Sequence, residues 1–185
     1  MSTLKIEAFT FEYNEVQDRI RLSGNLYNDG EEVSFWVTRR LALKLLKATT
    51  TLVEKTSPAI ANAPSDHRSA MAEFEHQSAQ LASSDAVETH SENANFEDSP
   101  SKNDTTGEVI VSKILSRVDI SFKDKHYKLS FFVDSQKQAA AFSVIEYNQL
   151  HQVLSLIHRG AVKLDWGVDS SLFNQGGEQT THTLQ

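Results

Sequence analysis

The chain has 185 residues, of which 39% are hydrophobic and none is cysteine; 25 acidic and 18 basic side chains give a net charge of −7. The absence of cysteine excludes disulfide scaffolds, thiolate metal sites and cysteine nucleophiles. The N-terminal residues lack the apolar core of a signal peptide, and no stretch approaches the roughly 18 apolar residues that a membrane span needs. We therefore expect a soluble, cytoplasmic protein without membrane contacts.

The first third of the chain shows strand alternation followed by helical periodicity. Apolar and polar residues alternate over 19–27 and over 33–38, on either side of an Asn-Asp-Gly turn signal. The stretch 4–13 is also rich in strand-forming residues, and its alternation slips once, where we expect a bulge. From Thr38, a candidate helix cap, the period changes to 3.6 residues. Residues 1–55 are therefore predicted to form three strands and a helix.

Residues 56–107 carry the whole excess of negative charge, with nine acidic and two basic side chains between two neutral segments. Few large apolar residues are present to offset the entropy of ordering, so we expect an acidic linker or insert that is largely disordered. Within it, Met71, Phe74 and Leu81 recur at helical spacing and predict a short helix over 66–81. Either this helix is nascent in a disordered segment, or it docks on the body or on a partner.

The last third repeats the first arrangement. Alternating runs at 118–122 and 127–133 flank a polar turn, and a short apolar run follows at 140–142. Ser143 and Glu146 have the spacing of a capping box, which predicts the start of a helix.

The end of this helix and the rest of the chain are predicted from local signals. Gly160 follows two cations and predicts the helix end. Residues 162–166 are expected to add a short closing strand, which completes a second unit over 108–168. Residues 169–185 lack periodicity and are expected to form a disordered tail.

The two thirds match when the first is shifted by 105 residues, which places Thr38 on Ser143 and Leu45 on Leu150. Either the halves arose by duplication, or they are two meanders that each end in a helix. We predict an α+β fold in which two pseudo-repeated antiparallel β-meander-plus-helix units pack as one body, with the acidic insert between them.

The sequence contains none of the motifs of a nucleophile elbow, a P-loop or a dinucleotide-binding loop. Glu73 and His76 have the Glu-x-x-His spacing of di-iron bundles, but the further ligands of such a site are missing. His151 and His158 lie off the main apolar stripe and are expected at the surface. We therefore expect no enzyme, no metal site and no cofactor.

Arg39 and Arg40 fall in the first turn of the first predicted helix, where the helix dipole disfavours cations. One interpretation pairs them with Glu31, Glu32 or a carboxylate of the insert. The other makes them a binding site for a phosphate or for a carboxylate of a partner.

A second candidate surface is the outward face of the first hairpin. Arg19, Arg21, Tyr27 and Trp36 are expected to project from it together, and aromatic rings beside guanidinium groups suit single-stranded nucleic acid. The layout resembles that of the PUR and Whirly single-strand binders, although each unit here has three clear strands where those families have four. Alternatively, Tyr27 and Trp36 pack against the other half of the protein.

A patterned body, a long acidic segment with one amphipathic patch and the lack of catalytic motifs favour a non-enzymatic protein-binding or assembly module. The partner is expected to bind through 66–81. The alternative is single-stranded nucleic-acid binding on the face that carries Arg19, Arg21 and Trp36, although the neutral halves offer phosphates no broad electrostatic attraction.

Overall fold

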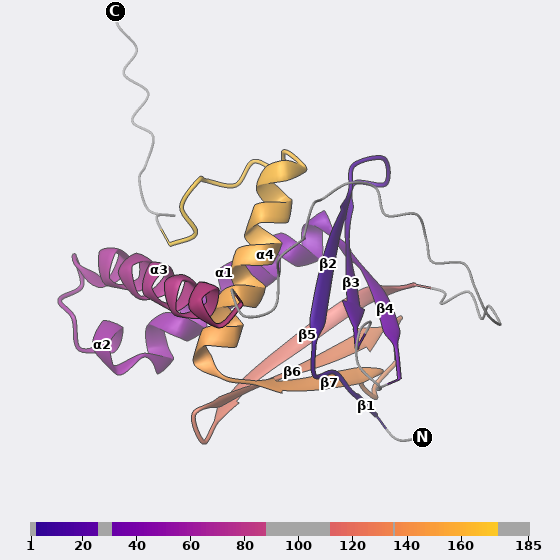
Figure 1. The fold of residues 1–185 in the computed structure, drawn as a ribbon, viewed down its shortest axis with the longest axis horizontal. Coiled ribbons are helices and arrows are strands. Elements are labelled where there is room, and N and C mark those ends of the chain that lie inside the picture. The colour runs from indigo at the N-terminus through magenta and orange to yellow at the C-terminus, as the bar shows by residue number, and fades with distance from the viewer. Residues whose placement is uncertain (1–2, 26–30, 88–111, 135, 174–185) are drawn as a thin grey trace, which may run out of the picture.

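The computed structural model describes residues 3–25, 31–87, 112–134 and 136–173 (Figure 1). The elements in chain order are β1 Leu4–Lys5, β2 Phe9–Asn14, β3 Arg19–Gly24, β4 Val33–Thr38, α1 Arg39–Thr56, α2 Pro58–Ala61, α3 Arg68–Val87, β5 Lys113–Lys123, β6 His126–Val133, β7 Ala141–Ile145 and α4 Tyr147–Lys163. The fold is mixed α+β, as predicted. The order of three strands and a helix occurs twice, as β2-β3-β4-α1 and as β5-β6-β7-α4.

All seven strands belong to one sheet, in the order β1-β7-β6-β5-β4-β3-β2. Neighbouring strands are antiparallel, except that β1 is parallel to β7 and β4 is parallel to β5. The contact between β4 and β5 joins the two three-stranded units edge to edge, with Phe35 opposite Lys113 and Trp36 opposite Ile114.

The sheet is bent until its two edges approach each other. β1 and β2 form opposite edges, yet only residues 6–8 connect them, and a chain spans at most about 3.6 Å per residue. Asn25 closes the seam: its side chain accepts a hydrogen bond from the Glu7 N–H (2.9 Å) and donates one to the Lys5 carbonyl (2.9 Å). Gly24 is needed there, because a Cβ atom would lie 2.9 Å from Ile6. The irregularity in stretch 4–13 is therefore a crossing between sheet edges.

The helices α1 and α4 cover one face of the bent sheet, and α3 packs against α4 on the side away from the sheet (Figure 1). The inner face of the sheet presents alternating buried residues to these helices, since side chains of a strand alternate between its faces. Among the core residues are Ile20, Leu22, Phe35, Val37, Leu129 and Phe131 from the strands and Leu46, Leu150, Leu154 and Ile157 from the helices.

The buried faces of the two long helices correspond at a different shift from the one predicted. Leu46 is buried whereas Leu45, the position that the predicted shift places on Leu150, is only half-buried, so the inward face of α1 is rotated toward Leu46. An offset of 108 residues places four of the five buried positions of α1, Ala42, Leu46, Thr49 and Val53, on buried positions of α4, whereas the predicted offset of 105 pairs the half-buried Leu45 with the buried Leu150.

Both predicted ends of the last helix are wrong. Ser143 lies in β7, where its hydroxyl donates to the Ile6 carbonyl (2.7 Å), and α4 begins at Tyr147 after the cap residue Glu146. Gly160 does not end the helix. It is buried against the Tyr13 ring, from which a Cβ atom would lie 2.5 Å away, so this glycine permits close packing.

The predicted closing strand over 162–166 is also absent from the structure. The helix α4 continues to Lys163, and the chain then turns so that Trp166 is buried in the core. The indole N–H of Trp166 donates to the Asp18 carboxylate in the β2–β3 turn, which holds this segment against the first unit.

Part of the predicted insert and part of the predicted tail belong to the folded body. The helix predicted over 66–81 is found as α3 and packs on α4, and α2 precedes it with Ile60 fully buried. Leu172 and Phe173 are buried as well, so the prediction of a disordered tail is wrong for these two residues. The remaining stretches predicted to be disordered, 88–107 and 174–185, lie outside the described residues.

Candidate functional site

The two arginines predicted to bind an anion lie at the start of α1, and both are exposed. Arg39 donates to the backbone carbonyl of Trp166 (3.1 Å) instead of pairing with a carboxylate. None of the ion pairs among the described residues involves Arg39 or Arg40. The interpretation that pairs them with Glu31 or Glu32 is therefore not supported, and anion binding at this helix start stays a prediction.

The predicted outward face of the first hairpin is formed in part. Arg21 lies directly opposite Trp36 in the sheet, and Arg19 lies opposite Thr38 on the same face. Arg21 is held by its neighbours, since it donates to the Ser34 hydroxyl (2.9 Å) and lies 3.5 Å from a carboxylate oxygen of Glu12. Tyr27, the fourth predicted residue, lies outside the described residues.

The same sheet face continues over the second unit with basic groups stacked on aromatic rings. The guanidinium of Arg117 lies 3.9 Å from the centre of the Phe132 ring, and it is also paired with Asp119 (3.1 Å). Lys128 lies 5.2 Å from the centre of the Phe142 ring. Because Phe132 is buried beneath Arg117, its ring is not free to stack on a base.

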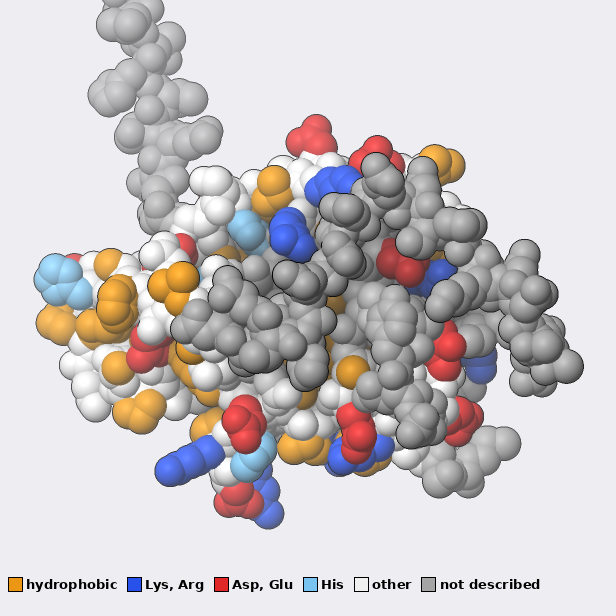
Figure 2. Space-filling view, in the orientation of Figure 1, with side chains coloured by type: hydrophobic (Ala, Val, Ile, Leu, Met, Phe, Trp, Pro, Cys, Tyr) orange, Lys and Arg blue, Asp and Glu red, His pale blue; other side chains and the backbone are white. Residues whose placement is uncertain are grey.

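The helix α3 differs from an ordinary amphipathic helix in the direction of its large apolar side chains. Its large apolar side chains point to solvent, with exposed fractions of 37% for Met71, 67% for Phe74 and 70% for Leu81. We call these three residues the α3 stripe. Figure 2 shows hydrophobic side chains gathered over the end of the molecule that α2 and α3 form. The residues used to predict the helix are thus its outer face.

The inner face of α3 consists of small and polar residues. Ala72 and Ala79 are buried against the body, and between them His76 is buried with only 5% of its surface exposed. The Nδ1 atoms of His76 and His151 lie 2.8 Å apart, which joins α3 to α4 through a hydrogen bond between two imidazoles. Polar groups can form such an interface only when they are paired, because an unpaired buried group is costly.

The prediction that His151 lies at the surface is wrong, since it is fully buried. Burial, together with the smaller effect of the neighbouring His76, lowers the pKa of His151 to about 4. Burial also lowers the pKa of His76, against the opposing charge of Glu73. Both imidazoles are therefore neutral near pH 7, so one donates its Nδ1 proton and the other accepts it. The Nε2 atom of His151 has no partner within the described part of the chain.

Glu73, on the same helix, fastens the C-terminal segment. Its carboxylate accepts hydrogen bonds from the Ser171 hydroxyl (2.8 Å) and from Gln77 (3.0 Å). Burial raises the pKa of Glu73, but these hydrogen bonds outweigh it, and the pKa lies below its ordinary value. Ser69 adds a bond to the Phe173 carbonyl (2.6 Å). Glu73 and His76, the pair with metal-type spacing, therefore contact different parts of the protein: Glu73 binds Ser171 of the C-terminal segment, and His76 binds His151 of α4.

A pocket of about 450 Å³, mostly apolar but with a few polar groups in its wall, lies where α1, α3, α4 and the β5–β6 turn meet. The Glu75 carboxylate reaches it from α3, and its Oε2 atom accepts hydrogen bonds from the Ser57 hydroxyl (2.8 Å) and from the Tyr147 hydroxyl. The Tyr127 hydroxyl lies beside them, 2.6 Å from Thr56. Because Thr56 donates its own proton to a backbone carbonyl, it accepts the proton of Tyr127. We call this site the Glu75 pocket.

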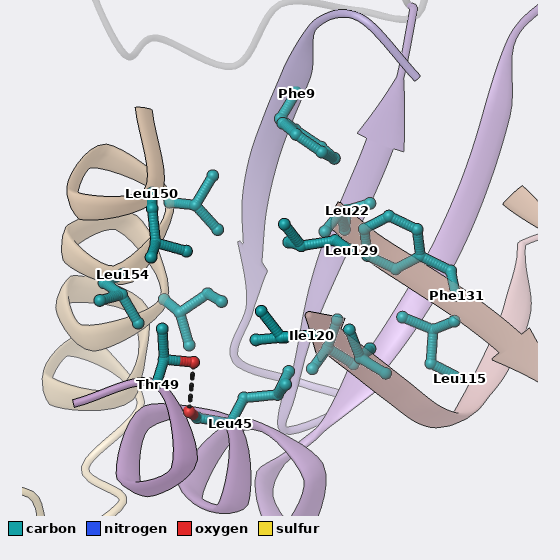
Figure 3. Close-up of a pocket in the computed structure, with 14 residues that line it drawn as sticks. Phe9, Leu22, Leu45, Thr49, Leu115, Ile120, Leu129, Phe131, Leu150 and Leu154 are labelled. Carbon is teal, nitrogen blue, oxygen red and sulfur yellow. Dashed lines mark hydrogen bonds between the residues drawn. The ribbon is translucent and has the colours of Figure 1, made fainter. Parts of the chain in front are cut away.

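A second cavity, between the sheet and the two long helices, is apolar and small, at about 20 Å³ (Figure 3). The only polar side chain in its wall is Thr49, whose hydroxyl donates to the Leu45 carbonyl (2.8 Å). The cavity has room for about one water but lacks the two or more polar partners a water needs. It is a gap in the core packing and not a binding site.

Comparison of the chain with protein-family models, with curated proteins and with solved structures finds no match. Over the residues that the structure describes, no cluster of three or more metal-ligating side chains is found. In that same part of the chain, no helix combines the length and apolar character needed to cross a membrane.

Sequence reasoning missed the Glu75 pocket, because its residues come from four separate segments. Glu75 lies in a helix that was predicted from other residues. Thr56 and Ser57 lie in the stretch before that helix, which was expected to be a disordered linker. Phe122 and Tyr127 belong to the predicted alternating runs at 118–122 and 127–133, but nothing there indicates a pocket. No local signal in the sequence joins these residues.

Proposed function

We propose that the protein is a non-enzymatic binding module whose α3 stripe docks an amphipathic helix of a partner protein. The observation that carries this proposal is the outward position of Met71, Phe74 and Leu81 on a helix that is already fixed to the body. Phe74 and Leu81 each expose more than two thirds of their surface. Exposed apolar residues gathered on one helix face are typical of protein interaction sites.

The stripe favours a helical partner with an apolar face of its own. Its three members follow one another at intervals of three and seven residues, which is the spacing that a facing helix matches. The exposed residues beside them on this face, Ala70, Gln77 and Ser78, are uncharged. A partner is therefore selected by apolar contact and not by opposite charge.

Photo-crosslinking tests this proposal in the native host. A photoreactive amino acid replaces Phe74 in one variant and Val16 in a control, because Val16 is an apolar residue that is 97% exposed in a turn far from α3. We expect one dominant protein to be captured at position 74 and not at position 16. The substitution Leu81→Ser should abolish this capture. Equal capture of the same proteins at both positions would contradict the proposal.

The alternative function, single-stranded nucleic-acid binding on the outer sheet face, is favoured by one observation. Arg21 and Trp36 are cross-strand neighbours, so a basic and an aromatic residue share the outer face of the sheet. Acidic neighbours such as Glu12 offset this charge. Titration of fluorescent single-stranded DNA at low salt, where phosphate contacts are strongest, tests it. Binding that is lost in Trp36→Ala would favour the alternative over the protein-binding proposal.

We also propose that the two β-β-β-α units are pseudo-repeats of one ancestral unit. Support comes from the repeated element order and from the common offset of 108 residues between the buried faces of α1 and α4. The parallel contact of β4 with β5 joins the units at their edges.

A further inference from the structure

The Glu75 pocket has the chemistry of a ligand site that is separate from the α3 stripe. Its volume of about 450 Å³ lies within the range of small-molecule pockets. One carboxylate lies in a wall that also contains hydroxyl groups, aromatic rings and Pro58, with Lys125 at the rim. The rings of Phe122 and Tyr127 are 4.7 Å apart and inclined at 41°, so they form an aromatic corner beside the carboxylate.

The hydrogen bonds in the pocket leave one strong acceptor free. The Oε2 atom of Glu75 accepts from both Ser57 and Tyr147, whereas Oε1 has no hydrogen-bond partner among the described residues. Burial, together with the hydrogen bond and the charge of Glu75, raises the pKa of Tyr147, so this phenol stays a neutral donor. Tyr127 donates its proton to Thr56. What the pocket offers a ligand is therefore one carboxylate oxygen and two aromatic faces.

We propose that the Glu75 pocket binds a primary ammonium group carried on an aliphatic stem. An ammonium ion donates to a free carboxylate oxygen and is attracted to aromatic faces, and the stem covers apolar ring surface. A guanidinium fits less well, because its two parallel donors need both carboxylate oxygens and Oε2 is already occupied.

Lys125 lies at the rim of the pocket, in the turn between β5 and β6, and its side chain is exposed. None of the ion pairs among the described residues joins it to Glu75. Its charge repels an incoming ammonium ion and competes with it for the carboxylate. Removing this charge is therefore expected to strengthen binding.

The ammonium group has two sources, a small free amine or a lysine side chain of another protein. Separate probes distinguish them: n-butylammonium stands for the free amine, and a short capped peptide with one central lysine stands for the side chain. Neutral 1-butanol and n-butylguanidinium are the matched comparison ligands. Binding is followed by NMR chemical-shift titration of the full chain in phosphate buffer, at the backbone amides of Glu75, Tyr127 and Tyr147.

We expect at least one ammonium probe to bind about tenfold more tightly than 1-butanol and more tightly than n-butylguanidinium. Glu75→Gln should weaken binding about tenfold or more, because it removes the charge of the carboxylate. Glu73→Gln, the same change on the same helix outside the pocket, should leave affinity within about twofold. Lys125→Gln should increase it. Preference for the peptide assigns the site to lysine side chains, and preference for the free amine assigns it to a small molecule.

A second variant guards against loss of folding in Glu75→Gln. Phe122 is 40% exposed, so Phe122→Ala should leave the melting temperature nearly unchanged while it weakens ammonium binding severalfold. Equal binding of 1-butanol and n-butylammonium, or unchanged affinity in both Glu75→Gln and Phe122→Ala, would overturn the proposal. These measurements do not involve the α3 stripe, so their failure leaves the proposed function standing.

Discussion

The helices α3 and α4 lie side by side, yet they place their apolar residues in opposite directions. On α4, Leu150, Leu154 and Ile157 point into the core and are almost completely buried. On α3, the largest apolar side chains point to solvent, and the contact with α4 is made by alanines and by a buried histidine pair. Apolar periodicity thus identifies the buried face of one helix and the exposed face of the other.

The difference shows that two kinds of force hold the helices. Burial of apolar surface stabilises α4 by an amount that scales with the area removed from water. Over residues 68–82, the part of α3 whose burial is described, the helix lacks large buried apolar side chains, so close packing of small residues and paired hydrogen bonds fix its position. The histidine pair, Glu73, Glu75 and Ser69 are among the groups that supply those bonds. Its apolar face is consequently available for another molecule.

The largest expected effect separates the two apolar faces directly. Leu154→Ala on α4 should lower the free energy of unfolding by about 2–5 kcal/mol, because it leaves a cavity in the core. Phe74→Ala on α3 should leave it unchanged or slightly raised, since Phe74 is exposed and alanine favours a helix. Urea unfolding followed by circular dichroism measures both. A loss above about 2 kcal/mol in Phe74→Ala would show that the α3 stripe is part of the core.

The second effect concerns acid. The pKa of His151 is about 4 in the folded protein, whereas its ordinary value is 6.5. Between these pH values the unfolded chain takes up a proton at His151 that the folded chain does not. The free energy of unfolding is therefore unaffected by protonation of His151 above pH 6.5, and it decreases by an amount on the order of 3 kcal/mol as the pH falls toward 4.

Urea unfolding at a series of pH values measures this loss. His151→Leu should flatten the pH dependence of stability between pH 4 and 6.5, whereas His126→Gln, a change at an exposed histidine, should not. If the dependence is the same in His151→Leu as in the parent protein, the histidine pair is not its source.

The third effect tests the small residues under α3. Ala79 is buried, so Ala79→Leu should cost about 1–3 kcal/mol by forcing α3 away from α4. The neighbouring Ser78 is exposed, and Ser78→Leu serves as the matched control with no expected loss. Equal stability of the two variants would mean that α3 does not pack closely at Ala79.

The smallest effect concerns the contact between the start of α1 and the segment that follows α4. Arg39→Gln removes the hydrogen bond to the Trp166 carbonyl and should lower stability by no more than about 1 kcal/mol. Arg40→Gln removes the same charge without a recorded hydrogen bond and should leave stability unchanged. The difference between their thermal melting temperatures measures the contribution of the bond. A larger loss in Arg40→Gln would place that residue in a structural contact.

The sequence predicted the elements that follow strict periods and failed where contacts are long-range. The strands of both units could be predicted because apolar and polar residues alternate along them. The helix α4 could be predicted because its apolar residues recur at helical spacing. The bent sheet could not, since it depends on Asn25 and Gly24 at a seam between distant edges. Gly160 was interpreted as a helix end because its true reason, contact with Tyr13, lies in another segment.

The candidate sites follow the same rule. The α3 stripe was predicted as one face of a helix, but the sequence did not predict that this face is turned to solvent. The orientation of α3 depends on the contact of His76 with His151, which is 75 residues away along the chain. Arg21 and Trp36 were placed correctly together, since a hairpin determines which residues share a face. The residues of the Glu75 pocket are brought together by tertiary packing alone.

The orientation of α3 is the central claim, and single-cysteine labelling tests it most directly. The chain has no native cysteine, so Phe74→Cys and Ala79→Cys each introduce a single thiol. Their rates of reaction with a water-soluble maleimide can be compared in the folded protein and in urea. The structure predicts that Cys at position 79 reacts roughly tenfold or more slowly than Cys at position 74 in the folded protein, because the buried thiol reacts only after local opening, and that the two rates are equal in urea. A protected thiol at position 74 together with a reactive one at position 79 would contradict this orientation and the binding surface inferred from it.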